Sequence, residues 1–321
     1  MAINIMEAAR IAANNGEFKK AGVLMTFAKQ SPLLQAIPTI DVDGNSYAWT
    51  RQAVLPGAAF RSLNAAYTES AGSTTRLTEA LKAVGGDIDV DNYIVQTGGA
   101  QARTTHEEMK STAIAQALGY AIVKGSLTAV GGATADPNGL DGLQARYGQG
   151  FSTSAVVDSG ANASQIIANN GAGDALSLAK LDEVILATDN TTHLLMAKKM
   201  RINITSKMRN SASLATTRDE FGRLVQTYNG IPILDADVNG DTAALGFNEN
   251  NDSTTSIYAL SLSPSGLHLI QAGGGMDVRD LGEQDSKPVW RTRIEWYVGL
   301  VDEHPRCVAR LYNIADAVAV D

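Results

Sequence analysis

The sequence predicts an α+β fold, in which a few helices stand among largely antiparallel strands. Two observations predict it. Between residues 222 and 314, segments rich in β-branched and aromatic residues follow one another, separated by turn residues. Before them, several segments repeat apolar residues at helical spacing. Strands and helices in such a mixed order are typical of α+β proteins.

Composition places the chain among ordered, soluble proteins. Of its 321 residues, 44% are hydrophobic and 19% charged, which argues against disorder and membrane insertion. The N-terminus lacks a signal-peptide pattern, and no apolar run is long enough to span a bilayer. Aromatic residues are only 6%, so burial within one chain supplies little energy per residue, and we expect contacts with neighbouring subunits to add to it.

The charge balance disfavours tight nucleic-acid binding. The net charge is −8, and phosphate binding relies on clustered Lys and Arg. The largest basic group is predicted to be the solvated face of a helix: Lys198, Lys199, Arg201, Lys207 and Arg209. The single cysteine, Cys307, excludes an intrachain disulfide and fits a reducing compartment.

Residues 1–40 are predicted to form an arm rather than a domain. Apolar residues from Ile5 to Ala12 have weak helical spacing, and Pro32 and Pro38 break any continuing helix. The apolar residues of this segment need a partner surface elsewhere.

A long excursion follows, from Val42 to Ala83. Residues 45–52 and 73–81 alternate as two strands do, and residues 54–72 between them carry no firm pattern. A structureless loop of this length inside one domain is uncommon unless it has a role outside its own subunit. We therefore expect this loop to act outside its own subunit.

The next elements alternate in type. Residues 85–96 predict a half-exposed strand, and residues 105–124 a long helix with capping boxes at Thr104 and Thr105. A turn-rich connector spans 131–150. Further helices are predicted at 177–190 and 194–209, before strands that are expected at 222–237, 253–263, 266–271, 289–303 and 306–314.

In their order and spacing, several strings together resemble the major capsid proteins of tailed phages, whose fold is named after the Hong Kong ninety-seven phage. They are SPLLQAIP at 31–38, residues 43–70, VDNYIV at 90–95, the helix from Thr105, GLDGL at 139–143 and YNGIPIL at 228–234. The resemblance implies an N-terminal arm at 1–40 and an extended loop at 41–83, laid across a neighbouring subunit. It further implies a peripheral domain with a spine helix at 84–150 and 286–321, and an axial domain at 151–285.

Within the extended loop, aromatic and arginine side chains are the candidate inter-subunit contacts, because these types dominate interface energetics. They are Tyr47, Trp49, Arg51, Phe60, Arg61, Tyr67 and Arg76. Some members of the family join subunits through a lysine of this loop, but no lysine stands between Lys29 and Lys82 here. We therefore expect no such crosslink.

The resemblance implies a structural major capsid protein of a double-stranded DNA bacteriophage or prophage, assembled as hexamers and pentamers into an icosahedral head. The expected partners are other copies of the chain, a separate scaffolding protein, a portal and, as an open question, a decoration protein. The scaffolding protein is inferred because the arm follows directly from the first methionine. We expect assembly in the host bacterial cytoplasm, a place in the virion, and enclosed DNA without specific binding.

The sequence shows no catalytic, cofactor or metal motif that we assign. The four histidines are scattered, and no phosphate-binding glycine motif occurs. Residues 235–241 match half of a calcium loop, but Gly246 stands where its closing Glu belongs, so a turn is preferred. Cys307 is expected to be buried. Two rival functions remain open: an encapsulin-type compartment of the same fold, and a soluble metabolic enzyme with a ligand pocket.

Overall fold

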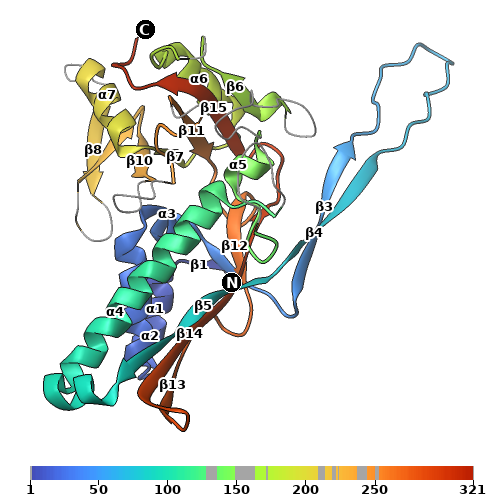
Figure 1. Cartoon of the computed structure of the whole chain (residues 1–321). Coiled ribbons are helices and arrows are strands. Elements are labelled where there is room, and N and C mark those ends of the chain that lie inside the picture. The colour runs from blue at the N-terminus through green and yellow to red at the C-terminus, as the bar shows by residue number, and fades with distance from the viewer. Residues whose placement is uncertain are drawn as a thin grey trace.

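The computed structural model describes residues 2–127, 136–148, 163–170, 173–208, 214–218, 222, 224–236, 244–249 and 253–320. It contains helices α1 (Ile5–Asn14), α2 (Phe18–Gln30), α3 (Pro32–Ala36), α4 (Asn92–Lys124), α5 (Leu143–Arg146), α6 (Leu178–Ala187) and α7 (Lys198–Met208), with a 3-10 turn at Ala163–Gln165. Its strands form two large sheets and a separate hairpin (Figure 1).

The first sheet is built around one long strand, β14 (Lys287–Asp302). One edge of β14 pairs along ten residues with β5 (Lys82–Asp91), and the other edge pairs with β13 and then with β12. The sheet also contains β1 (Ala2–Ile3), β2 (Thr39–Asp41), β12 (Leu267–Gln271) and β13 (Asp277–Gln284). Gly85 is required in β5, because a Cβ there would lie 2.2 Å from the Ile294 carbonyl oxygen.

The second sheet has the order β6-β15-β11-β7-β10-β9-β8. Its inner strand β11 is rich in β-branched residues and buried along its whole length, as expected of a strand covered on both faces. The bounds are β6 (Ile166–Ala168), β7 (His193–Met196), β8 (Leu214–Arg218), β9 (Leu224–Tyr228), β10 (Ile231–Asp235), β11 (Thr254–Leu260) and β15 (Val308–Ala315).

The hairpin consists of β3 (Ser46–Val54) and β4 (Ser73–Ala80), and it projects away from the rest of the molecule (Figure 1). This confirms the two strands expected within residues 42–83. Residues 55–72 form the loop at its tip and contain no helix or strand. Among the described strands, β3 and β4 pair only with each other.

The N-terminal helices pack on their own chain. Phe27, Leu34 and Ile37 are completely buried in the core, and the Phe27 ring meets the edge of Trp296 on β14 with ring centroids 6.1 Å apart. Strand β2 then joins the first sheet beside β12. The surface that the apolar residues of 1–40 were expected to need therefore lies on the same chain, and the segment is part of its folded body.

Helix α4 begins earlier than the sequence predicts. It starts at Asn92, where the Asp91 side chain accepts a hydrogen bond from the Tyr93 amide, so the strand expected through residue 96 ends at Asp91. Thr104 and Thr105 lie inside the helix and do not cap it. A break at Gly99, whose φ is 70°, interrupts the helix and sets the segment before it at an angle. The predicted end before Gly125 is confirmed.

The later helices and sheets differ from the expected elements in three respects. Residues 194–196 belong to β7, and helix α7 starts only at Lys198, whereas α6 confirms the helix predicted at 177–190. The last two strands do not pair with each other, because β14 lies in the first sheet and β15 in the second. Strands β12 and β13, which were assigned to the axial segment 151–285, pair with β14 instead. None of the described helices has both the length and the apolarity needed to cross a bilayer.

Candidate functional site: the projecting hairpin and its root

The hairpin has two different faces along β3 and β4. Side chains alternate across a strand, and every second residue of β3 is half-buried: Tyr47, Trp49 and Arg51. On β4, Leu77 lies opposite Trp49, and Glu79 lies opposite Tyr47, on the same half-buried face. This face is turned toward the body of the molecule, and we call its contacts with the body the root.

Strand β3 is held at the root by the end of β14. Arg51 Nη2 lies 3.1 Å from Asp302 Oδ2, and Arg51 also donates to the Asp302 and Glu303 carbonyl oxygens. The Tyr47 hydroxyl donates to Glu303 Oε1 at 2.6 Å, and its ring stacks on Trp49. Charge-assisted bonds of this kind are short and directional, so they fix the strand in one orientation.

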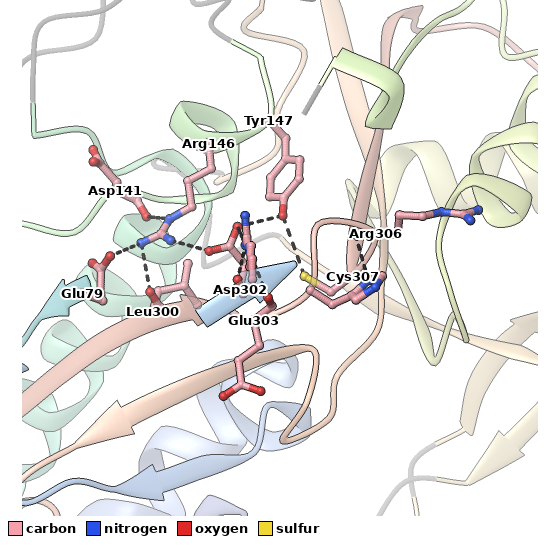
Figure 2. A network of polar contacts seen from close by, with 11 residues as sticks. Glu79, Asp141, Arg146, Tyr147, Leu300, Asp302, Glu303, Arg306 and Cys307 are labelled. Atoms are coloured by element: carbon pink, nitrogen blue, oxygen red, sulfur yellow. Dashed lines mark hydrogen bonds and ion pairs between the residues drawn. The ribbon is translucent and has the colours of Figure 1, made fainter. Parts of the chain in front are cut away.

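Strand β4 is held by α5. Arg146 of α5 contacts Glu79 Oε2 at 3.0 Å and Asp302 Oδ1 at 2.9 Å, and it donates to the Leu300 and Asp141 carbonyl oxygens (Figure 2). The hydroxyl of Tyr147 donates to Asp302 Oδ2 at 3.0 Å. The Asp302 carboxylate on β14 thus joins β3 to α5, while Arg146 of α5 holds Glu79 of β4 directly.

Burial dominates the electrostatics of the root. It raises the pKa of the Glu79 carboxyl despite the neighbouring Arg146 guanidinium, which lowers it. Burial also raises the pKa of the Cys307 thiol to about 12, so Cys307 stays protonated beside Tyr147. The burial expected of Cys307 is confirmed, since it is 1% exposed. The root is thus a largely buried set of paired charges, and its one thiol is protonated.

The tip of the hairpin is exposed to solvent, whereas its root is partly buried. Leu55, Phe60, Leu63 and Tyr67 all stand exposed there, with Phe60 at 108% and Leu63 at 94% of full exposure. The Arg61 guanidinium lies over the Tyr67 ring, 5.1 Å from its centroid. Several large apolar side chains exposed at the end of a projecting element are typical of a protein interaction surface.

The candidate contact residues therefore separate into two groups. Tyr47, Trp49 and Arg51 contact their own chain at the root, whereas the others are exposed along the hairpin: Phe60, Arg61, Tyr67 and Arg76. Sequence reasoning missed the partners Glu79, Arg146, Asp302 and Glu303. Glu79, Arg146 and the Asp302–Glu303 pair stand far apart in the chain, and nothing in their spacing signals that the fold brings them together.

The other candidate sites occupy ordinary structural positions. Asp235 ends β10 and lies 3.2 Å from Arg201, while residues 237–243 of the possible calcium loop lie outside the described part of the chain. In the part that is described, no three His, Cys, Asp or Glu side chains gather as metal ligands would. Of the basic group predicted to be a solvated helix face, Lys198, Lys199 and Lys207 are exposed on α7, Arg201 is half-buried, and Arg209 lies outside the described residues.

A comparison with models of protein families identifies the family of this chain. The model of the family Major capsid protein GP7 matches residues 15–179, slightly more than half of the chain. The chain belongs to this family. As a major capsid protein it associates with copies of itself, and its place is the capsid of the virion. No curated protein matches the sequence.

Solved structures with the same fold include viral and particle capsids and an encapsulin complex. The cyanophage A-1(L) capsid has a TM-score of 0.61 at 14% identity, covering 90% of this chain and 93% of that one. The capsid of a native GTA particle has a TM-score of 0.61 at 16% identity, covering 88% and 90%. The holo-SrpI encapsulin complex of Synechococcus elongatus PCC 7942 also reaches 0.61, at 14% identity, covering 90% and 89%. The fold is the α+β Hong Kong ninety-seven type capsid fold.

Proposed function

We propose that this chain forms the icosahedral head of a tailed double-stranded DNA bacteriophage or prophage, packing as hexamers and pentamers around the genome. The observation that carries the proposal is the exposed tip of the hairpin. Phe60, Leu63 and Tyr67 stand on an element that leads away from the body, so their own chain cannot cover them. A second copy can.

The energetics of the tip favour many copies over an isolated pair. Burial of one large apolar side chain contributes about 1.5–3 kcal/mol, whereas association of two proteins costs about 4–15 kcal/mol in lost translational and rotational freedom. A single hairpin contact is therefore weak. In a closed shell every subunit both extends a hairpin and receives one, so these contacts add to the others that hold each subunit in place.

The proposed division of the chain follows its sheets. Residues 41–83 act as the extended loop that reaches the neighbour. The first sheet with α4 as spine helix forms the peripheral part, and the second sheet forms the axial part around the hexamer or pentamer axis. Residues 1–40, proposed as an arm from the sequence, belong to the peripheral part in this scheme, since their helices pack in its core.

Enclosure of DNA without specific binding agrees with the charges. The net charge is −8, and the arginines on the exposed face of β14 are paired: Arg291 binds Asp89 and Arg293 binds Asp87, each through two hydrogen bonds. Paired arginines offer little to phosphate. The role is structural rather than enzymatic, and we include in the proposal a separate scaffolding protein, a portal, an optional decoration protein, and assembly in the host bacterial cytoplasm.

Size-exclusion chromatography with negative-stain electron microscopy tests this function directly. The purified chain, alone and together with its scaffolding protein, is expected to yield closed particles. A Phe60→Ser, Leu63→Ser double variant should remain folded and fail to close shells, while the control Thr78→Ser, an exposed position on β4, should assemble normally. A wild-type chain that stays a small oligomer under both conditions would contradict the proposal and favour the soluble enzyme.

An encapsulin-type compartment is the second candidate, because the likeness to the encapsulin structure equals the likeness to the phage capsids in TM-score. Both functions predict a shell. The contents of particles purified from the native source separate them: nuclease-protected genomic DNA supports the phage head, whereas a packaged enzyme supports the compartment.

A further inference from the structure

The direction of the hairpin depends on side-chain contacts at its root. Strands β3 and β4 pair only with each other among the described strands, and the chain joins them to the body through single connections at each end. The ladder of β5 with β14 begins at Lys82, beyond the base of the ribbon, and among the described strands no strand of the body pairs with β3 or β4 themselves. The polar contacts of the root restrain the angle of the hairpin.

Asp302 is the residue at which these contacts meet. Its Oδ1 accepts a hydrogen bond from Arg146 Nη1 at 2.9 Å, and its Oδ2 lies 3.1 Å from Arg51 Nη2 and 3.0 Å from the Tyr147 hydroxyl. Asp302 is only 6% exposed. Its single negative charge therefore balances one arginine of the hairpin and one of α5, in a place that water reaches poorly.

The second strand of the hairpin is connected to the same point through Arg146. This guanidinium lies between Glu79 on β4 and Asp302 on β14, 3.0 Å from Glu79 Oε2 (Figure 2). Loss of the Asp302 charge would leave Arg51 and Arg146 facing each other without the anion that separates them. Strand β3 would then lose its ion pair with β14, and the Arg146 guanidinium that holds Glu79 of β4 would lose its own anchor on β14.

The root also lies where the chain passes between the two sheets. Residues 303–307 lead from β14 in the first sheet to β15 in the second, beside residues 261–266, which lead from β11 to β12. The two connections are hydrogen-bonded, from the Glu303 amide to the Gly266 carbonyl and from the Ser261 amide to the Cys307 carbonyl. An element held at Asp302 is thus held relative to both sheets at once.

We propose that Asp302 is a positioning residue for assembly: it sets the angle at which the hairpin leaves the body, and through that angle the fit of the tip to the neighbouring copy. The inference rests on the proposed shell function, because the angle matters only if the tip has a neighbour. Phe60 and Tyr67 make the contact, and Asp302 acts on them at a distance, through Arg51 and Arg146.

The experiment measures the hairpin angle in the unassembled subunit. Nitroxide labels at Ser62→Cys on the tip and Glu108→Cys on α4 report a distance distribution by pulsed electron spin resonance, while the buried Cys307 stays unlabelled. Asp302→Asn should at least double the width of that distribution and lower the yield of closed shells at least tenfold. The control Glu295→Gln changes another carboxylate of β14, which pairs with Arg279 of β13 away from the root, and it should change neither.

The outcomes separate this inference from the proposed function. If wild-type shells form and Asp302→Asn leaves both the distribution and the shell yield unchanged, the positioning role is wrong although the shell function stands. If wild-type protein forms no shells while Asp302→Asn still widens the distribution, the restraint is real and the shell function is wrong. Should Asp302→Asn not fold, Arg51→Gln decides, since it frees β3 alone and leaves Arg146 on Asp302; an unchanged distribution there overturns the inference.

Discussion

Arg310 and Glu249 form an ion pair in the core, and removal of its cation should strongly lower the free energy of unfolding. Arg310 is 0% and Glu249 3% exposed, and Arg310 Nη2 lies 3.0 Å from Glu249 Oε2. Arg310 also donates to the Ser256 hydroxyl and to the carbonyl oxygens of Tyr147 and Gly148. This arrangement ties β15 to β11 and to the end of α5.

The substitution Arg310→Met removes the cation and leaves the carboxylate of Glu249 buried. Among the described side chains, Glu249 then keeps neutral donors, Ser256 at 2.5 Å and Gln144 at 3.1 Å. An uncompensated buried charge costs about 3–5 kcal/mol. Because domains are stable by about 5–15 kcal/mol, the loss is a large share of the total. With a slope of about 3 kcal/mol per molar urea, the unfolding midpoint should fall by roughly 1–1.7 M.

Urea unfolding of unassembled subunits, followed by circular dichroism, measures the loss. The double variant Arg310→Met, Glu249→Leu removes both charges and should recover most of the stability, since apolar replacements of buried ion pairs are often neutral. The reasoning is refuted if Arg310→Met alone costs less than about 1 kcal/mol, or if the double variant is as unstable as the two single losses added together.

Two further predictions concern the core and its response to pH. Phe27→Ala removes a fully buried ring that contacts Trp296, and it should lower the free energy of unfolding in urea by about 3–5 kcal/mol. The control Phe18→Ala, on the exposed face of the same helix, should change that free energy by no more than about 0.5 kcal/mol. Equal losses in the two variants would contradict the packing described. Burial lowers the pKa of His193 from 6.5 to about 4, so the folded state favours the neutral ring. The free energy of unfolding should therefore fall as the pH drops from 6.5 toward 4, by on the order of 2–3 kcal/mol. His193→Gln should flatten this part of the pH profile, and an unchanged slope would exclude His193 as its source.

Local patterns predicted the elements whose signals are local. Alternation in residues 45–52 and 73–81 predicted β3 and β4, and the apolar stripe before Lys124 predicted the second half of α4. The first half escaped, because Gly98 and Gly99 argue against a helix while the Asp91 cap lies further upstream. The two overlapping Thr–Glu pairs have the spacing of capping boxes, but the continuing helix overrides them.

Of the candidate site, the sequence located the loop that forms the tip, where Phe60 and Tyr67 are exposed. Their contact with a neighbouring subunit stays a prediction. The root could not be predicted, since Arg51, Arg146 and Asp302 are joined by long-range folding and not by spacing. The separation of the last two strands was also missed, because strand patterns do not say which sheet a strand joins.

The continuity of β4 with β5 gives the hairpin mechanical strength. Strand β4 passes through Leu81 directly into β5, and β5 runs antiparallel to β14 from Lys82, opposite Val298, to Asp91, opposite Val289. A pull on the tip is therefore directed along β5 and loads this ladder in shear. All of its hydrogen bonds share the tension, instead of breaking one after another as in an unzipping ribbon. A force that a neighbouring subunit applies to the hairpin is thus resisted by the whole β5–β14 ladder.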